Sequence, residues 1–472
     1  MAVAEWKALP AIYDGKVTNL IAGEWCFLIS VVRRKTLASL ILAVISFAGL
    51  ISVQAQSKPA PKPTPTVESV FAGAPFEKWQ VDGPHQDLPW KVKMSADKLS
   101  FHQRLIALIQ IDVPVSELLK RLHDEQITFL VAVRNGQGIS ARNYGLLDMA
   151  NFKQEMKGSD VEFSWVAFAA PGQYEVSVAM WDKKSGEHNF MTHLFHVDAY
   201  KNDPLPEMWR GLDAFEFWSD SRDPVEYLFH PDIEGKLYLP LKTKRQIDLE
   251  LLLDMTPSAE IYRGNVDYYN RYLIAAVPMF RTFSQIDVLN GSRRAAALDL
   301  VHKKIPFEQT GGNDLDWMKF SKILVPENSP GTVSVKELQD RKQSPVFLRE
   351  EIVRRLSDPA FQGRKQGEKP LHVFVLIGSP MDRYSFPQLP AIETGNEEDC
   401  LIYYLQFNFF ERPVSAGGRR HRIYRFEGDD ITGAVGNVEK MLKPLKVRTF
   451  QVHSADEVRH ALAKVMEEVG AR

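Results

Sequence analysis

The pattern of apolar and polar residues changes along the chain, and its first regular part is typical of β-strands. From residue 90 to 198, apolar residues alternate with polar ones at a period of two. Turn signals such as Asn135–Gly138 and Pro171–Gly172 separate these runs. The pattern predicts an antiparallel β-sandwich domain, with one helix at Val115–Asp124. Its expected strands include Lys91–Met94, Leu105–Ile111, Thr128–Val133, Glu162–Phe168 and Tyr174–Trp181.

From residue 245 to 470 the pattern changes to strands that alternate with amphipathic helices. Such alternation predicts a doubly wound, mostly parallel sheet with helices on both faces. The expected strands are Ile247–Leu253, Ile286–Leu289, Ala295–Leu300, Leu371–Ile377, Cys400–Phe407 and Val447–Val452. The expected helices are Tyr268–Phe283, Ser344–Arg355, Val435–Leu442 and Ala455–Val469.

Two segments connect these regions to each other and to the N-terminus. Residues 199–244 are rich in aromatic residues, which free linkers lack, so we expect an irregular connector that packs on a neighbouring domain. Residues 56–67 alternate proline with small or basic residues, which is typical of an extended, semi-rigid tether.

The N-terminal region carries the pattern of an export signal. The cations Arg33, Arg34 and Lys35 precede an uncharged apolar stretch at residues 36–53, and the small residue Ala55 follows. In one interpretation, residues 31–55 are a cleaved signal peptide, and residues 1–30 are a non-native extension. In the other, residues 36–53 are an uncleaved membrane anchor with a cytoplasmic tail at residues 1–30. Both interpretations predict a periplasmic or extracellular protein that meets a membrane only through this segment.

Charge and cysteine content exclude several classes of function. The formal net charge is −2, so no basic surface for nucleic acid is expected. Of two cysteines, Cys26 precedes the signal pattern, so a processed chain would keep only Cys400 and could form neither an internal disulfide nor a cysteine-based zinc site. Because Cys400 lies in an apolar run, we expect a buried small hydrophobic residue rather than a nucleophile.

Candidate chemistry follows the strand Ile247–Leu253. Asp254, Thr256 and Ser258 stand where ligands bind in open α/β sheets, beyond the carboxyl end of a strand. Their oxygens are suited to Mg²⁺. This Asp-x-Thr-x-Ser motif resembles the metal-ion-dependent adhesion site of the von Willebrand factor A domain, and the resemblance covers roughly residues 246–470. The segment at residues 171–186 is similar to a hairpin of the immunoglobulin-like modules that accompany such domains in bacterial exported proteins.

The resemblance implies further ligands, but this chain departs from the family pattern. Ser344 is the nearest hydroxyl to the family's threonine position, and Thr310 is a second candidate. The family's last aspartate is replaced by Gly378-Ser-Pro, with Asp382 displaced. Two interpretations stay open: a metal site at Asp254, Thr256, Ser258 and Ser344, or a degenerate site whose side chains only cap a turn and a helix.

These observations support three hypotheses about function. The first is an exported, non-enzymatic binding or adhesion protein of the cell envelope, in which an acidic group of a protein partner completes the coordination of Mg²⁺. The second is an exported hydrolase that uses Asp254 with Asp314 or Asp382. The third is an inert structural component of the envelope. Nucleophile-elbow, Walker A and zincin motifs are absent from the sequence.

Overall fold

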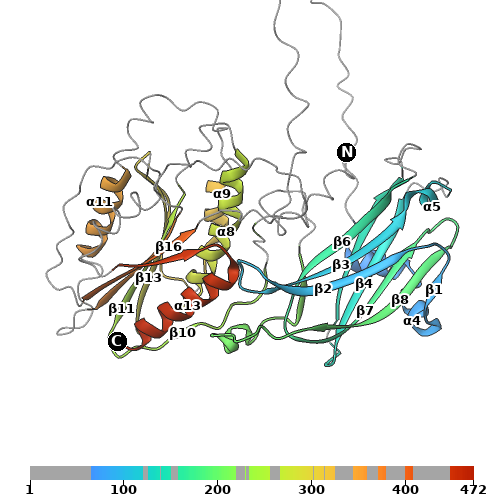
Figure 1. Cartoon of the computed structure of the whole chain (residues 1–472), viewed down its shortest axis with the longest axis horizontal. Helices are drawn as coiled ribbons and strands as arrows, with labels where there is room; N and C mark the ends of the chain where they lie inside the picture. The colour runs from blue at the N-terminus through green and yellow to red at the C-terminus, as the bar shows by residue number, and fades with distance from the viewer. Residues whose placement is uncertain are drawn as a thin grey trace, which may run out of the picture.

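The chain forms two structured regions, a pair of antiparallel sheets and a mixed sheet with helices (Figure 1). The computed structural model describes residues 65–120, 126–138, 140–149, 158–218, 229, 233–255, 266–300, 302–312, 314–324, 344–358, 370–378, 399–407 and 447–472. Several predicted segments lie outside these residues. They are the signal or anchor, the tail before it, nearly all of the proline-rich linker and the expected helix Val435–Leu442. Among the described helices, none is long and apolar enough to cross a lipid bilayer.

The N-terminal region is a β-sandwich of two antiparallel sheets. One sheet has the order β1-β8-β7-β4-β5 and the other β2-β3-β6-β9. The five expected strands are confirmed, and the expected helix is confirmed only over α5 (Val115–Leu119). The strands are β1 (His85–Gln86), β2 (Lys91–Leu99), β3 (Leu105–Pro114), β4 (Gln126–Asn135), β5 (Ser140–Asp148), β6 (Asp160–Ala169), β7 (Gly172–Trp181), β8 (His188–Val197) and β9 (Phe215–Phe217).

One apolar core fills the space between the two sheets, because alternate residues of each strand point inward. Ile109, Phe129 and Val176 are fully buried in it. The hydroxyl of Tyr174 lies 2.7 Å from the carbonyl oxygens of Ala170 and Ala214 and can donate to one at a time. Such a bond to a carbonyl a few residues upstream is the tyrosine corner of immunoglobulin-like sandwiches.

Two short helices cover the outer face of the five-stranded sheet, and the sequence pattern did not predict them. They are α3 (Val67–Gly73), capped by the Thr66 hydroxyl, and α4 (Phe76–Asp82). Phe71, Phe76 and Trp79 from these helices form a separate apolar cluster on that sheet. The N-terminal segment is therefore part of the sandwich domain.

The C-terminal region is built on a six-stranded sheet with the order β14-β13-β11-β15-β16-β17. Neighbouring strands from β13 to β17 run parallel, whereas β14 returns antiparallel to β13. Its strands are β11 (Ile247–Asp254), β13 (Gly291–Asp299), β14 (Lys304–Thr310), β15 (Leu371–Gly378), β16 (Cys400–Phe407) and β17 (Arg448–Val452), and a small parallel pair joins β10 (Pro240–Leu241) to β12 (Asp287–Val288).

Helices pack on both faces of this mixed sheet and create two cores. Leu249, Leu251 and Leu253 of β11 belong to the larger core, together with α8 (Val266–Ser284), α9 (Trp317–Leu324) and α13 (Ala455–Gly470). Leu252 belongs to the smaller core under α11 (Ser344–Leu356), on the other side of the sheet (Figure 1). Because the side chains of β11 alternate, its even-numbered residues face α11.

The predicted fold class, a sandwich followed by a doubly wound von Willebrand factor A-like domain, is corrected by this structure. Among the described residues, strand makes up 44% and helix 28%, so β structure dominates there. Antiparallel pairing builds both sandwich sheets and also joins β13 to β14. Apolar runs between amphipathic helices show that strands are covered on both faces, but they do not specify a family. The chain is a β-rich protein of antiparallel sheets and one mixed sheet, and no von Willebrand factor A domain is shown.

The junction between the two regions is organised by Arg459 of α13. Its fully buried guanidinium forms two hydrogen bonds with the Asp203 carboxylate, at 2.9 and 2.6 Å. It also donates to the Leu205 carbonyl at 3.0 Å and lies 4.7 Å from the centre of the Trp209 ring. Trp209 in turn donates to the Gln103 carbonyl of the sandwich at 2.6 Å. The start of the 199–244 segment is therefore fixed between the two regions.

We expect Arg459→Ala to lower the free energy of unfolding by about 3–5 kcal/mol, because it leaves the Asp203 carboxylate buried without its partner. The C-terminal region and the 199–217 segment should also become easier to cleave. Chemical denaturation and limited proteolysis measure these two effects. Lys464→Ala on the same helix, where Lys464 is 48% exposed, is the control and should cost less than about 1 kcal/mol. Equal effects of the two substitutions would contradict the role given to Arg459.

Candidate functional site

Asp254 is the last residue of β11, at the carboxyl edge of the mixed sheet. It is 6% exposed, and its even position turns it toward the α11 face. The hydroxyl of Tyr272 in α8 donates to the Asp254 backbone carbonyl at 2.6 Å. The strand end is thereby held in place by the helix that packs on the opposite face. The prediction that Asp254 stands at this edge is confirmed.

Asp254 shares this edge with Gly378 and Gln406, which end the next two parallel strands. Gly378 and Gln406 are register partners, and a Cβ atom at Gly378 would lie 3.2 Å from the Asp254 Cβ and 3.5 Å from its Oδ2. A side chain at position 378 would therefore crowd Asp254, and the neighbour would have to move by a few tenths of an ångström. Gln406 is 1% exposed, and its Oε1 has no hydrogen-bond partner among the described residues. The strands of Asp254 and Gln406 are roughly 10 Å apart, with the strand of Gly378 between them.

Among the other predicted site residues, the structure describes the side chains of Thr310 and Asp314. Thr256, Ser258 and Asp382 lie outside the described residues. Ser344 is the first residue of α11, and its side chain is likewise outside the description. Thr310 is exposed at the end of β14, which runs toward the amino end of β13. Thr310 therefore lies toward the amino edge of the sheet, away from the carboxyl edge where Asp254 stands, and cannot act with it.

Asp314 also lies near the amino edge of the sheet. Its carboxylate is 3.7 Å from Arg281 in the last turn of α8. Its backbone carbonyl accepts a hydrogen bond from Gln309 of β14 at 2.9 Å. Asp254 and Asp314 are thus separated by most of the length of β11, on the order of 15 Å. The pairing of these two carboxylates in a hydrolase has no geometric support.

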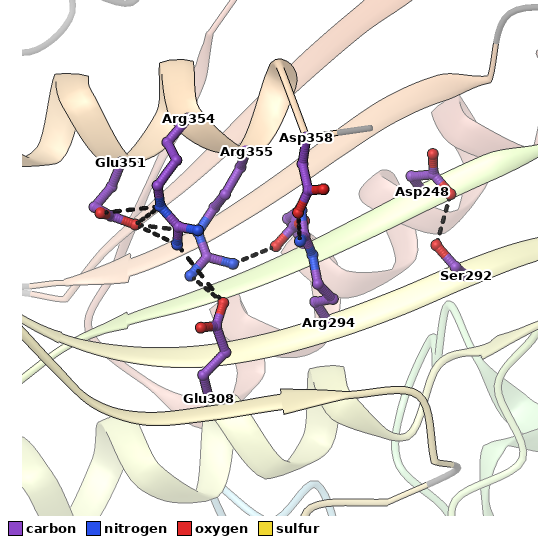
Figure 2. A network of polar contacts seen from close by, with 9 residues as sticks. Asp248, Ser292, Arg294, Glu308, Glu351, Arg354, Arg355 and Asp358 are labelled. Atoms are coloured by element: carbon purple, nitrogen blue, oxygen red, sulfur yellow. Dashed lines mark hydrogen bonds and ion pairs between the residues drawn. The ribbon is translucent and has the colours of Figure 1, made fainter. Parts of the chain in front are cut away.

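A network of charged side chains joins α11 to the sheet (Figure 2). Its Glu250 lies on the same sheet face as Asp254, closer to the amino end of β11. The fully buried guanidinium of Arg355 in α11 donates to Glu250 of β11 and to Glu308 of β14, both at 2.8 Å. Arg294 of β13 also binds Glu250 and donates to Asp358 at 2.6 Å. Glu351 and Arg354 extend the network along α11. These bonds join the helix to three strands of the sheet.

Burial dominates the electrostatics of this network. Burial raises the pKa of the Glu250 carboxyl above its ordinary value, although the Arg355 and Arg294 guanidiniums oppose this change. The two cations therefore offset a large desolvation cost. The buried arginines and carboxylates pair with one another and join α11 to the sheet, which is the arrangement of a structural ion-pair cluster.

Cys400 begins β16 on the same face and is a buried free cysteine, as predicted. Burial and the neighbouring Asp399 carboxylate raise the pKa of its thiol to about 12. A thiol with this pKa carries almost no thiolate near neutral pH, and thiolate is the nucleophilic form.

The sequence reasoning missed the two neighbours of Asp254. Gly378 was noted only as part of a departure from a family pattern, and Gln406 was not singled out. Both follow from strand register: they end adjacent apolar strands, as Asp254 does. Register could not be read from one sequence, because the connections between β11, β15 and β16 are long.

Comparisons with known proteins show no family for this chain. Neither a protein-family model nor a curated protein matches the sequence. Among solved structures, the chain is similar over 24% of its length to the chicken interferon gamma receptor alpha chain, with 14% identity, a TM-score of 0.16 and coverage of 51% of that chain. It is similar over 25% of its length to the PKD domain of human SorCS2, with 16% identity, a TM-score of 0.14 and coverage of 79% of that domain. These neighbours are β-sandwich domains of the immunoglobulin-like kind, and none shows a von Willebrand factor A domain.

Arg354 and Arg355 allow a matched test of the charged network. Arg355→Met removes a fully buried cation from between Glu250 and Glu308, and we expect it to lower the free energy of unfolding by about 3–5 kcal/mol. Arg354, whose side chain is 47% exposed, should tolerate the same substitution with a loss of at most about 1 kcal/mol. Denaturant unfolding of both variants measures the difference, and similar losses would contradict a structural role for the buried pairs.

The environment of Cys400 predicts an unreactive thiol in the folded protein. In a Cys26→Ser variant at pH 8, we expect alkylation by iodoacetamide to be about a hundredfold or more slower than in guanidinium chloride. Mass spectrometry of timed samples measures both rates. Rapid labelling of Cys400 under native conditions would show that β16 opens or that the thiol is not buried.

Proposed function

We propose that this chain is an exported, non-enzymatic binding protein whose ligand-facing site is the carboxyl edge of the mixed sheet, at Asp254. The observation that carries the proposal is the row of Asp254, Gly378 and Gln406 at the ends of three adjacent parallel strands. It combines a buried carboxylate, a glycine packed beside it, and a buried amide oxygen without a described partner. The ends of parallel strands are where open sheets of this kind bind their ligands.

The chemistry of the row favours a hard divalent cation. A carboxylate and an amide carbonyl are oxygen ligands of the kind that Mg²⁺ takes, together with water. Asp254 would supply the negative charge, and Thr256 and Ser258 follow it with hydroxyl groups. In this proposal an acidic side chain of a protein or envelope partner completes the coordination of the cation. Binding would then depend on both the metal and the partner's carboxylate.

Export is the second part of the proposal. It is supported by the sequence at Arg33–Ala55, with its basic start, apolar stretch and small-residue end. A proline-rich tether would then hold the sandwich and the mixed sheet away from the membrane. A binding protein in the periplasm or outside the cell needs such a spacer when its partner belongs to the envelope.

Titration with Mg²⁺ tests the binding site. We expect millimolar Mg²⁺ to raise the thermal midpoint of the full-length protein by a few degrees, because an ion that binds only the folded state stabilises it. Asp254→Asn keeps the size of the side chain but removes its charge, so this response should be lost. Differential scanning calorimetry with and without the ion measures the response.

Asp314→Asn is the matched control, because Asp314 is a carboxylate of the same domain at the opposite edge. The Mg²⁺ response of this variant should equal that of the unmodified chain. An equal response in Asp254→Asn, or none in any protein, would contradict a cation site at Asp254.

A further inference from the structure

A cluster of two histidines and one aspartate lies on the sandwich, far from the edge of the mixed sheet. His85 belongs to β1, Asp87 directly follows β1, and His188 begins β8. One ligand atom of each residue can be chosen so that all three lie within 4.8 Å of one another. The His85 Nε2 is 2.9 Å from Asp87 Oδ1, and the His188 Nδ1 is 4.0 Å from Asp87 Oδ2. Potential ligand atoms of two imidazoles and a carboxylate thus lie close to one another.

Hydrogen bonds to the backbone hold this cluster in place. The fully buried Asn189 accepts from the backbone N–H groups of Asp87 and Leu88, at 2.8 and 2.9 Å, and donates to the Leu88 carbonyl at 2.8 Å. The Asp87 Oδ2 accepts from the backbone N–H of His188 at 2.8 Å. Burial raises the pKa of Asp87, but the His188 backbone N–H and the two imidazoles more than reverse this, so its carboxyl stays below its usual pKa. The aspartate is therefore ionised and fixed in direction.

The histidine rings stack on a buried tryptophan. The ring of His188 lies 4.5 Å from the Trp79 ring of α4 at an angle of 13°, and the ring of His85 lies 4.4 Å from His188 on its other side. His188 is held between two rings, whereas the side chain of His85 is 49% exposed. His85 is thus the member that can turn with little resistance.

We propose that His85, Asp87 and His188 form a zinc site that fastens the N-terminal segment to the β-sandwich. Two imidazole nitrogens and one carboxylate oxygen are a ligand set that Zn²⁺ takes in proteins, with water in the fourth position. Tetrahedral bonds of about 2.0–2.1 Å place ligand atoms about 3.3 Å apart. The ligand atoms of the cluster lie within 4.8 Å of one another, so they must approach by up to about 1.5 Å. The tilt of His85 out of the stack supplies this shift, because parallel rings cannot both direct their in-plane lone pairs at one ion.

The bound ion would link the segment of β1 to β8, so the attachment of this segment would depend on the metal. His85 and Asp87 lie in the segment that follows α3 and α4, whereas His188 begins β8, the strand with which β1 pairs. In the described residues, β1 contributes only the pairs His85–Phe190 and Gln86–Asn189 to its sheet. A short edge strand of this kind contributes little by itself, so a bound ion would add a large share of its attachment.

Equilibrium dialysis with Zn²⁺ and thermal unfolding test this proposal on the full-length protein without a histidine tag. We expect the unmodified chain to bind one Zn²⁺ ion that the His85→Ala and Asp87→Asn variants do not bind at the same concentration. We also expect saturating Zn²⁺ to raise the thermal midpoint of the unmodified chain by on the order of 3 °C. His85→Ala should weaken the Zn²⁺ dissociation constant at least tenfold. Asp87→Asn, which preserves the size of the side chain, should weaken it similarly and tests the site independently of any folding defect in His85→Ala.

His196→Ala is the matched control. His196 lies on the same sheet beside a single carboxylate, with its Nε2 3.2 Å from Asp198 Oδ1, and is 60% exposed. This variant should bind Zn²⁺ like the unmodified chain, and so should Asp254→Asn, because the proposal does not depend on the edge of the mixed sheet. Equal Zn²⁺ affinity in the unmodified chain, His85→Ala and Asp87→Asn would overturn the proposal.

Discussion

The arrangement of the two regions depends on one buried ion pair, between Arg459 and Asp203. A guanidinium without solvent contact is costly unless its donors are satisfied. Here the Asp203 carboxylate and the Leu205 carbonyl accept from it, and the Trp209 ring covers it. These partners belong to the connector, which contacts the sandwich through the Trp209–Gln103 bond. The position of the C-terminal helix and the course of the connector are therefore set together.

One face of the mixed sheet carries both the charged network and the site proposed for binding. Toward its amino edge, Glu250 and the neighbouring arginines neutralise one another within the fold. Toward its carboxyl edge, Asp254 and Gln406 flank Gly378 and contribute a buried carboxylate and a buried amide. The first group joins α11 to the strands, and in our proposal the second group provides the ligands.

The sequence predicted most strands and three of the C-terminal helices, because period and length decide these locally. It predicted the place of Asp254, since a polar residue after a buried strand marks a strand end. The von Willebrand factor A-like fold that it predicted is not shown, because runs such as Leu371–Gly378 report burial alone and do not specify a family. It missed α3 and α4, because each is only seven residues long and carries few apolar residues. It also missed the His85–Asp87–His188 cluster: the His-x-Asp pair is visible, but its pairing with β8 depends on contacts between residues about a hundred positions apart.

The packing of α3 and α4 on the sandwich has a mechanical consequence. A pulling force applied to the chain before Pro65 would first load the hydrogen bond from the Tyr144 hydroxyl to the Pro65 carbonyl, at 2.5 Å. It then passes to the aromatic cluster of Phe71, Phe76 and Trp79. These contacts join the helices to the face of a sheet rather than to its strand ends, so they would separate by peeling, one contact after another. The first structure to yield under tension would be this helical cover, while the sandwich core and the mixed sheet stayed folded.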